Sequence, residues 1–102
     1  MSNPFAHLDA IRRGRLTAAL EAAEELGRAE GLSGVAECAS SGLMSMMVGN
    51  PVEGAHRAAD VAEYIAELIE LGEYDAKGAE YAVGLEVWRA SNAVLAAAGG
   101  RA

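Results

Sequence analysis

Cysteine, proline and aromatic residues are scarce in this sequence, and each scarcity excludes a class of structure. The lone cysteine, Cys38, can form no disulfide within the chain, and one thiol cannot build a cysteine-based metal site. The 2 prolines leave long stretches free to be helical. Aromatic residues amount to 5%, too few for the stacking platforms that bind nucleic acids. The sequence therefore lacks the marks of a disulfide scaffold or a base-stacking surface.

Positive charge and long apolar runs are also in short supply. The chain has 8 Lys and Arg residues against 15 Asp and Glu residues, for a formal net charge of −7. Nucleic acids and anionic membranes bind basic surfaces, so we expect neither as a partner. No apolar run of about 18 residues occurs, and the first residues do not resemble a signal peptide. We therefore expect a cytoplasmic protein.

Apolar and small residues are abundant. Hydrophobic residues make up 52% of the 102 residues, alanine is the commonest of them, and β-branched residues are few. Alanine loses no side-chain entropy in a helix, whereas valine, isoleucine and threonine do. A chain of this length favours one domain. The composition therefore predicts a single all-α domain.

Two pairs of local signals divide the chain into similar halves. Asn3-Pro4 and Asn50-Pro51 each resemble a helix start, with an asparagine cap followed by proline at the first helical position. Glu53, three residues after Asn50, resembles the second part of a capping box. Glu25-Leu26-Gly27 and Glu70-Leu71-Gly72 each resemble a helix end followed by glycine. The same order in both halves favours a duplicated helical hairpin.

These signals predict two tandem antiparallel hairpins, arranged either as stacked repeats or as a four-helix bundle. We expect one domain over residues 1–98, with hairpin units 3–49 and 50–97 and a frayed tail at 99–102. The predicted helices span residues 4–26 with an interruption near Gly14, then residues 33–48, 51–71 and 75–97.

The predicted helices differ in how their polar residues are distributed. Between residues 51 and 71 the charged residues follow one narrow stripe: Glu53, Arg57, Asp60, Glu63, Glu67 and Glu70. The apolar sector beside this stripe is wider than one neighbouring helix needs. Between Gly31 and Asn50 the only charged residue is Glu37. Such a helix should be covered on most sides, which predicts an oligomer, most simply a dimer.

Methionines and one tryptophan are the best candidates for an interface. Met44, Met46 and Met47 fall within one helical turn, so at least one of them should face outward or into an interface. Adaptable methionine surfaces recur where proteins bind one another. Leu43 belongs to the same bulky cluster, and Trp88 lies on an apolar row of the last predicted helix.

A family resemblance supports this interpretation. The run from Ala19 to Gly27, then Gly42-Leu43, Gly49-Asn50-Pro51 and a second alanine-rich helix resemble tetratricopeptide-type repeats of the longer kind found in bacterial regulators. The resemblance covers roughly residues 15–95, and its motifs are of low specificity. Ala23 and Glu30 stand where that family often carries large aromatic residues. The resemblance implies a protein-binding scaffold with no catalytic chemistry.

Two metal-dependent alternatives remain open. Glu53 and His56 form an E-x-x-H pair on one helical face, as in ferritin-like iron and manganese sites, and Glu24 is a candidate further ligand. Separately, an acidic set resembles the Mg²⁺ ligands of all-α nucleotide pyrophosphohydrolases, except that Arg57 stands where a carboxylate is needed. The residues of that set are Glu21, Glu24, Glu25, Asp60 and Glu63.

The first hypothesis is a non-enzymatic module that binds a protein partner or a second copy of itself. It requires no cofactor and assigns the interface to Leu43, Met44, Met46, Met47 and Trp88.

Overall fold

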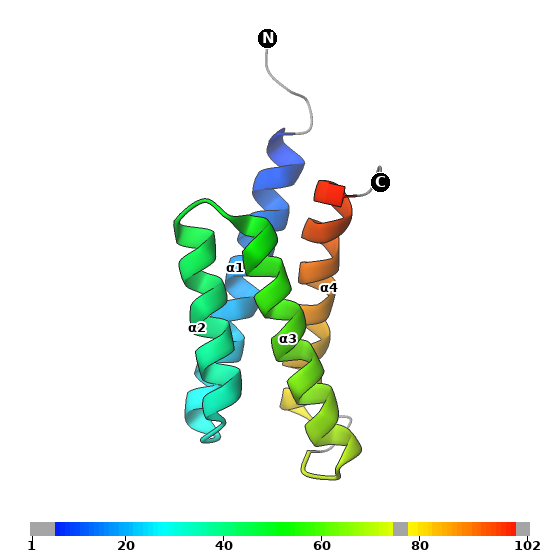
Figure 1. The fold of residues 1–102 in the computed structure, drawn as a ribbon. Helices are drawn as coiled ribbons and strands as arrows, with labels where there is room; N and C mark the ends of the chain where they lie inside the picture. Colours follow the sequence, from blue (N-terminus) through cyan, green and yellow to red (C-terminus); the bar gives the residue numbers. More distant parts are fainter. Residues whose placement is uncertain (1–5, 75–77, 100–102) are drawn as a thin grey trace.

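The computed structural model describes residues 6–74 and 78–99 and consists of four α-helices in that part of the chain. They are α1 (Ala6–Ala29), α2 (Ser33–Met47), α3 (Pro51–Glu70) and α4 (Ala79–Gly99), shown in Figure 1. The prediction of an all-α fold with four main helices is confirmed. None of the helices within the described residues is long and apolar enough to cross a membrane.

Three helices end with the same backbone motif. Gly31, Gly49 and Gly72 follow the ends of α1, α2 and α3 with φ angles of 71°, 80° and 79°, in the left-handed region that glycine tolerates best. After α3, the N–H of Glu73 donates to the carbonyl of Leu68 at 2.9 Å, which closes a Schellman turn. The turns stop each helix and return the chain to form an antiparallel neighbour.

The predicted end of the first helix is wrong. Gly27 does not follow the helix but lies inside α1, buried against α2, and the residue past the helix end is Gly31. The expected interruption near Gly14 is also absent, since α1 continues through it. Gly27 and Gly72 therefore have different roles, and the repeat of Glu-Leu-Gly does not mark equivalent positions.

The other predicted boundaries are close to those observed. Asn50 caps α3, because its side-chain oxygen accepts a hydrogen bond from the N–H of Glu53 at 3.2 Å. The last helix begins at Ala79 instead of Asp75, after a bend at Gly78. Asp75 itself and the first Asn-Pro pair lie outside the described residues, as do residues 100–102 of the expected tail. Gly99, the first residue of that tail, is the last helical residue of α4.

The helices form a closed antiparallel ring. Helix α1 packs against α2 and α4, and α3 also packs against α2 and α4. Helices α1 and α3 touch only slightly, and α2 and α4 do not touch within the described residues. Of the two arrangements that the sequence leaves open, this ring is the four-helix bundle. Figure 1 shows the elongated result, with extents of 51 × 23 × 21 Å.

Small residues let the helix backbones approach closely in the core. Glycine, alanine and valine supply most of the buried positions, with Leu16, Leu20 and Ile65 as the largest buried side chains. A Cβ added at Gly54 of α3 would lie 2.5 Å from the sulfur of Met46 on α2. A Cβ added at Gly84 of α4 would lie 2.9 Å from Cγ2 of Ile65 on α3. The core is therefore thin, and several larger apolar side chains remain outside it.

Candidate protein-interaction surfaces

A groove lies on the surface between α3 and α4. Its volume is about 390 Å³, and its lining is mostly apolar. The apolar lining residues are Ala62, Ile65, Ala66 and Ile69 on α3 and Tyr81, Gly84, Leu85 and Trp88 on α4. We call this hollow the α3–α4 groove.

Two aromatic side chains of α4 line this groove and are exposed to solvent. Tyr81 is 43% exposed and Trp88 is 52% exposed, although both are large enough to be buried in a core. Leu85 lies one turn from each of them and is half-buried. The predicted interface residue Trp88 therefore belongs to a defined concave surface, and aromatic side chains are enriched at protein interfaces.

Two carboxylates border the groove. Glu63 and Glu70, seven residues apart on α3, are exposed and line it, and no basic side chain of the described residues does so. The nearest cation along α4 is Arg89; the hydrogen bond from Arg15 is the largest cause that lowers the pKa of Glu86, and the charge of Arg89 adds to it. The groove therefore combines an apolar floor with an acidic edge.

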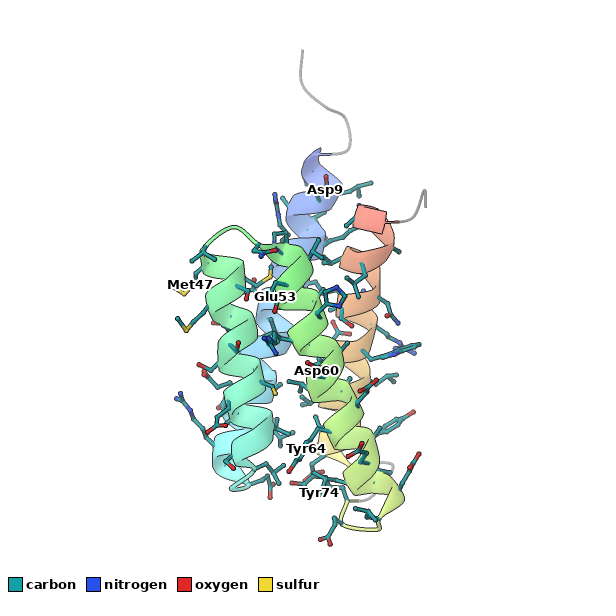
Figure 2. All side chains as sticks on the ribbon, viewed as in Figure 1. Asp9, Met47, Glu53, Asp60, Tyr64 and Tyr74 are labelled. Carbon is teal, nitrogen blue, oxygen red and sulfur yellow. The ribbon has the colours of Figure 1, made fainter. Side chains whose placement is uncertain are left out.

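A second apolar surface lies at the end of α2. Met44, Met47 and Val48 are 65%, 84% and 80% exposed. Figure 2 shows Met47 directed away from the bundle. We call these three residues the methionine patch. The sequence predicts that at least one methionine of the cluster faces outward or into an interface, and two of them are exposed.

The remaining predicted interface residues on α2 lie elsewhere. Leu43 and Met46 are half-buried and pack against the core. Met46 fills the space that a side chain at position 54 would otherwise occupy. Trp88 does not join the methionine patch, because α2 and α4 stand at opposite corners of the ring. The predicted residues thus divide between the core and two separate surfaces.

The residues proposed for metal binding lie near other charges. Glu53 is 3.2 Å from the Nε of Arg57, and Glu24 on α1 is 3.3 Å from Arg28. His56 is exposed on α3. Figure 2 shows Glu53 and Asp60 along α3. No three His, Cys, Asp or Glu side chains gather closely enough for a metal ion in the part of the chain that the structure describes.

The acidic residues of the hydrolase-like set belong to two helices at opposite corners of the ring. Glu21, Glu24 and Glu25 are on α1, whereas Asp60 and Glu63 are on α3, and these two helices touch only slightly. Glu21, Glu25, Asp60 and Glu63 are exposed. Asp60 also lies 4.0 Å from Arg57, so a cation stands beside it.

Sequence patterns missed an ion pair that links the first helix to the last. The guanidinium of Arg15 donates two hydrogen bonds to Glu86, at 2.7 and 2.9 Å. These hydrogen bonds lower the pKa of Glu86 and raise that of Arg15. The 71-residue separation of Arg15 and Glu86 left no local signal for the pair.

Burial raises the pKa of Tyr74, and the charge of Glu30 adds to the effect.

Sequence patterns also missed the α3 wall of the groove. Ala62 and Ile69 belong to the apolar sector that is too wide for one neighbouring helix, which was the available signal, whereas Ala66 was not assigned to that sector. Their pairing with the Tyr81 row depends on the antiparallel alignment of α3 and α4, which only the fold supplies.

In comparisons with known proteins, no protein-family model, no curated protein and no solved structure matches this chain.

Proposed function

We propose that this chain is a non-enzymatic α-helical protein-interaction module that assembles as a homodimer through the methionine patch. The observation that carries the proposal is the exposure of Met44, Met47 and Val48 on a helix with almost no charge. The cytoplasm is the proposed location, where a single thiol such as Cys38 stays reduced.

Charge favours a second copy as the occupant of this patch. With a net charge of −7, two copies repel each other across most of their surface. The outer face of α2 is different, because Glu37 is the only charged residue of the helix. Two copies can therefore bring their methionine patches together with little repulsion.

The size of the patch predicts a dimer of modest affinity. Fully burying a methionine or valine side chain contributes about 1.5–3 kcal/mol. Scaled by the exposed fractions of the three side chains, burial on both copies releases about 7–14 kcal/mol at most. Association costs about 4–15 kcal/mol in lost freedom. Since the two ranges are similar, the dimer should dissociate on dilution.

Sedimentation equilibrium over a range of about 1 to 100 μM tests this proposal. The mass should rise with concentration from 10.5 kDa toward twice that value. The double variant Met44→Glu/Met47→Glu should remain a monomer with unchanged helical content, since both side chains are already exposed.

A matched control separates the patch from the effect of added charge. Ala18→Glu/Ala22→Glu adds the same two charges at exposed positions of α1 and should dimerise nearly as well as the unmodified chain. A monomer at every concentration would refute the proposal. So would equal loss of the dimer in both double variants, because net charge would then explain it.

A further inference from the structure

The α3–α4 groove has a geometry suited to binding one more helix. Its walls are two rows of side chains spaced by four and three residues, the repeat of a helix surface. The rows are Ala62, Ala66 and Ile69 on α3, and Tyr81, Leu85 and Trp88 on α4. The first and last residues of each row are seven positions apart, so each row spans about 10 Å, or two helical turns.

The floor and rim of the groove differ in a way that suits helix binding. Gly84 and Ala66 are small and leave the space that forms the hollow, while the large side chains of Tyr81 and Trp88 lie beside it. Amphipathic helices bind such grooves with apolar anchors about one turn apart. Exposed aromatic rings at the rim also attract Arg and Lys side chains through cation–π contacts.

The charge at the groove determines whether a partner should carry positive or negative charge. Glu63 and Glu70 lie on one wall, and neither takes part in the ion pairs found among the described residues. Arg89 is exposed on α4, where its charge acts on Glu86. A helix lying in the groove would therefore meet two carboxylates that pair with no cation in the part of the chain that the structure describes.

We propose that the α3–α4 groove binds an amphipathic helix of a second protein, apolar on its buried face and carrying Lys or Arg at the edge beside Glu63 and Glu70. A second copy of this chain fits poorly, because two such grooves face to face would place four of these glutamates together. The methionine patch lies at the end of α2, next in the chain to the start of α3, whereas the groove is lined by residues 62–70 in the second half of α3 and by α4, so dimer formation leaves the groove free. The inference therefore does not depend on the dimer.

The test uses a displayed library of helical peptides selected on the purified full chain. Each peptide has leucines at positions i, i+3, i+4 and i+7 and no aromatic residue, and its flanking positions are randomised among Lys, Glu and Gln. Selection should enrich Lys at the flanking positions. Enrichment of Glu, no preference, or no retained peptide would overturn the proposal.

Fluorescence then locates the selected peptide. Trp88 is the single tryptophan of the chain, so its emission should shift to the blue when a peptide without aromatic residues covers the groove. Ala66→Arg places a large cation in the groove at an exposed position and should weaken binding by more than about tenfold. Ala22→Arg, on the exposed face of α1, should change affinity by less than about twofold.

A second pair of variants isolates the charge. Glu63→Gln/Glu70→Gln should weaken binding of the selected peptide by about five- to tenfold at low salt, with a smaller effect at high salt. Glu21→Gln/Glu37→Gln changes the net charge equally at exposed sites on α1 and α2 and should have little effect. Equal losses in the two double variants, or retained binding to Ala66→Arg, would show that the peptide does not dock in the groove.

Discussion

The close approach of α1 and α2 predicts opposite effects for one substitution at two positions of the same helix. Gly14 and Gly27 both lie inside α1, so replacement of either by alanine removes the same conformational freedom from the unfolded chain. At Gly14 nothing lies within 4 Å of an added Cβ. Gly14→Ala should therefore stabilise the protein by about 0.5–1 kcal/mol.

At Gly27 the added methyl group meets backbone. It would lie 2.6 Å from the nitrogen and 3.0 Å from the Cα of Ala36 on α2. Backbone cannot rotate away as a side chain can, so the two helices must move apart. Overpacking of this kind costs about 1–3 kcal/mol, and the backbone contact places it in the upper part of that range. After the gain in helix propensity, Gly27→Ala should destabilise the protein by about 1–2 kcal/mol.

Thermal unfolding followed by circular dichroism measures both effects. For a domain of this size, 1 kcal/mol changes the melting temperature by about 4–8 °C. Gly14→Ala should melt above the unmodified chain and Gly27→Ala below it. A higher melting temperature for Gly27→Ala as well would show that α1 and α2 do not pack closely at Gly27 and Ala36.

Three further predictions concern stability and metal binding. Because Arg15 lowers the pKa of Glu86, stability from this pair should be present above the ordinary pKa of 4.5 and lost as the pH falls through the lowered value. The melting-temperature difference between the unmodified chain and Glu86→Gln should accordingly shrink between pH values of about 7 and 3. Met46→Asp should abolish soluble folded protein, whereas Glu67→Ala, at an exposed position, should change stability by less than about 0.5 kcal/mol in urea titrations. Protein purified without chelator or a histidine tag should retain no stoichiometric iron, manganese or zinc by mass spectrometry. A metal lost on His56→Ala would contradict that expectation.

The sequence predicts elements of this fold wherever a signal is local. The Asn50-Pro51 start of α3 and the Gly72 end follow from hydrogen bonds within a few residues, and both are confirmed. Gly27 follows the same Glu-Leu pair as Gly72 but lies within a helix, because packing on Ala36 requires a residue without a Cβ. A glycine that ends a helix and one that permits close packing look alike in sequence.

For the candidate surfaces too, the sequence predicts what depends on neighbouring residues and does not predict what depends on contacts between helices. The crowding of methionines within one turn predicts that some face outward, and Met44 and Met47 do. The burial of Met46 follows from its place opposite Gly54, which depends on the register of α2 and α3. Trp88 could be identified as a candidate from its helical row. The groove beside it could not, because its other wall belongs to α3.

The most direct test of the central proposal is nuclear magnetic resonance of methionine methyl groups during dilution. Methionines 44, 46 and 47 report on the same turn of α2, but only the first and last are exposed. Labelled methyl signals should be followed from about 500 to about 5 μM, where a modest dimer dissociates. The signals of Met44 and Met47 should shift with concentration, while that of Met46 stays nearly constant. Constant signals from Met44 and Met47 over this range would contradict self-association through the methionine patch.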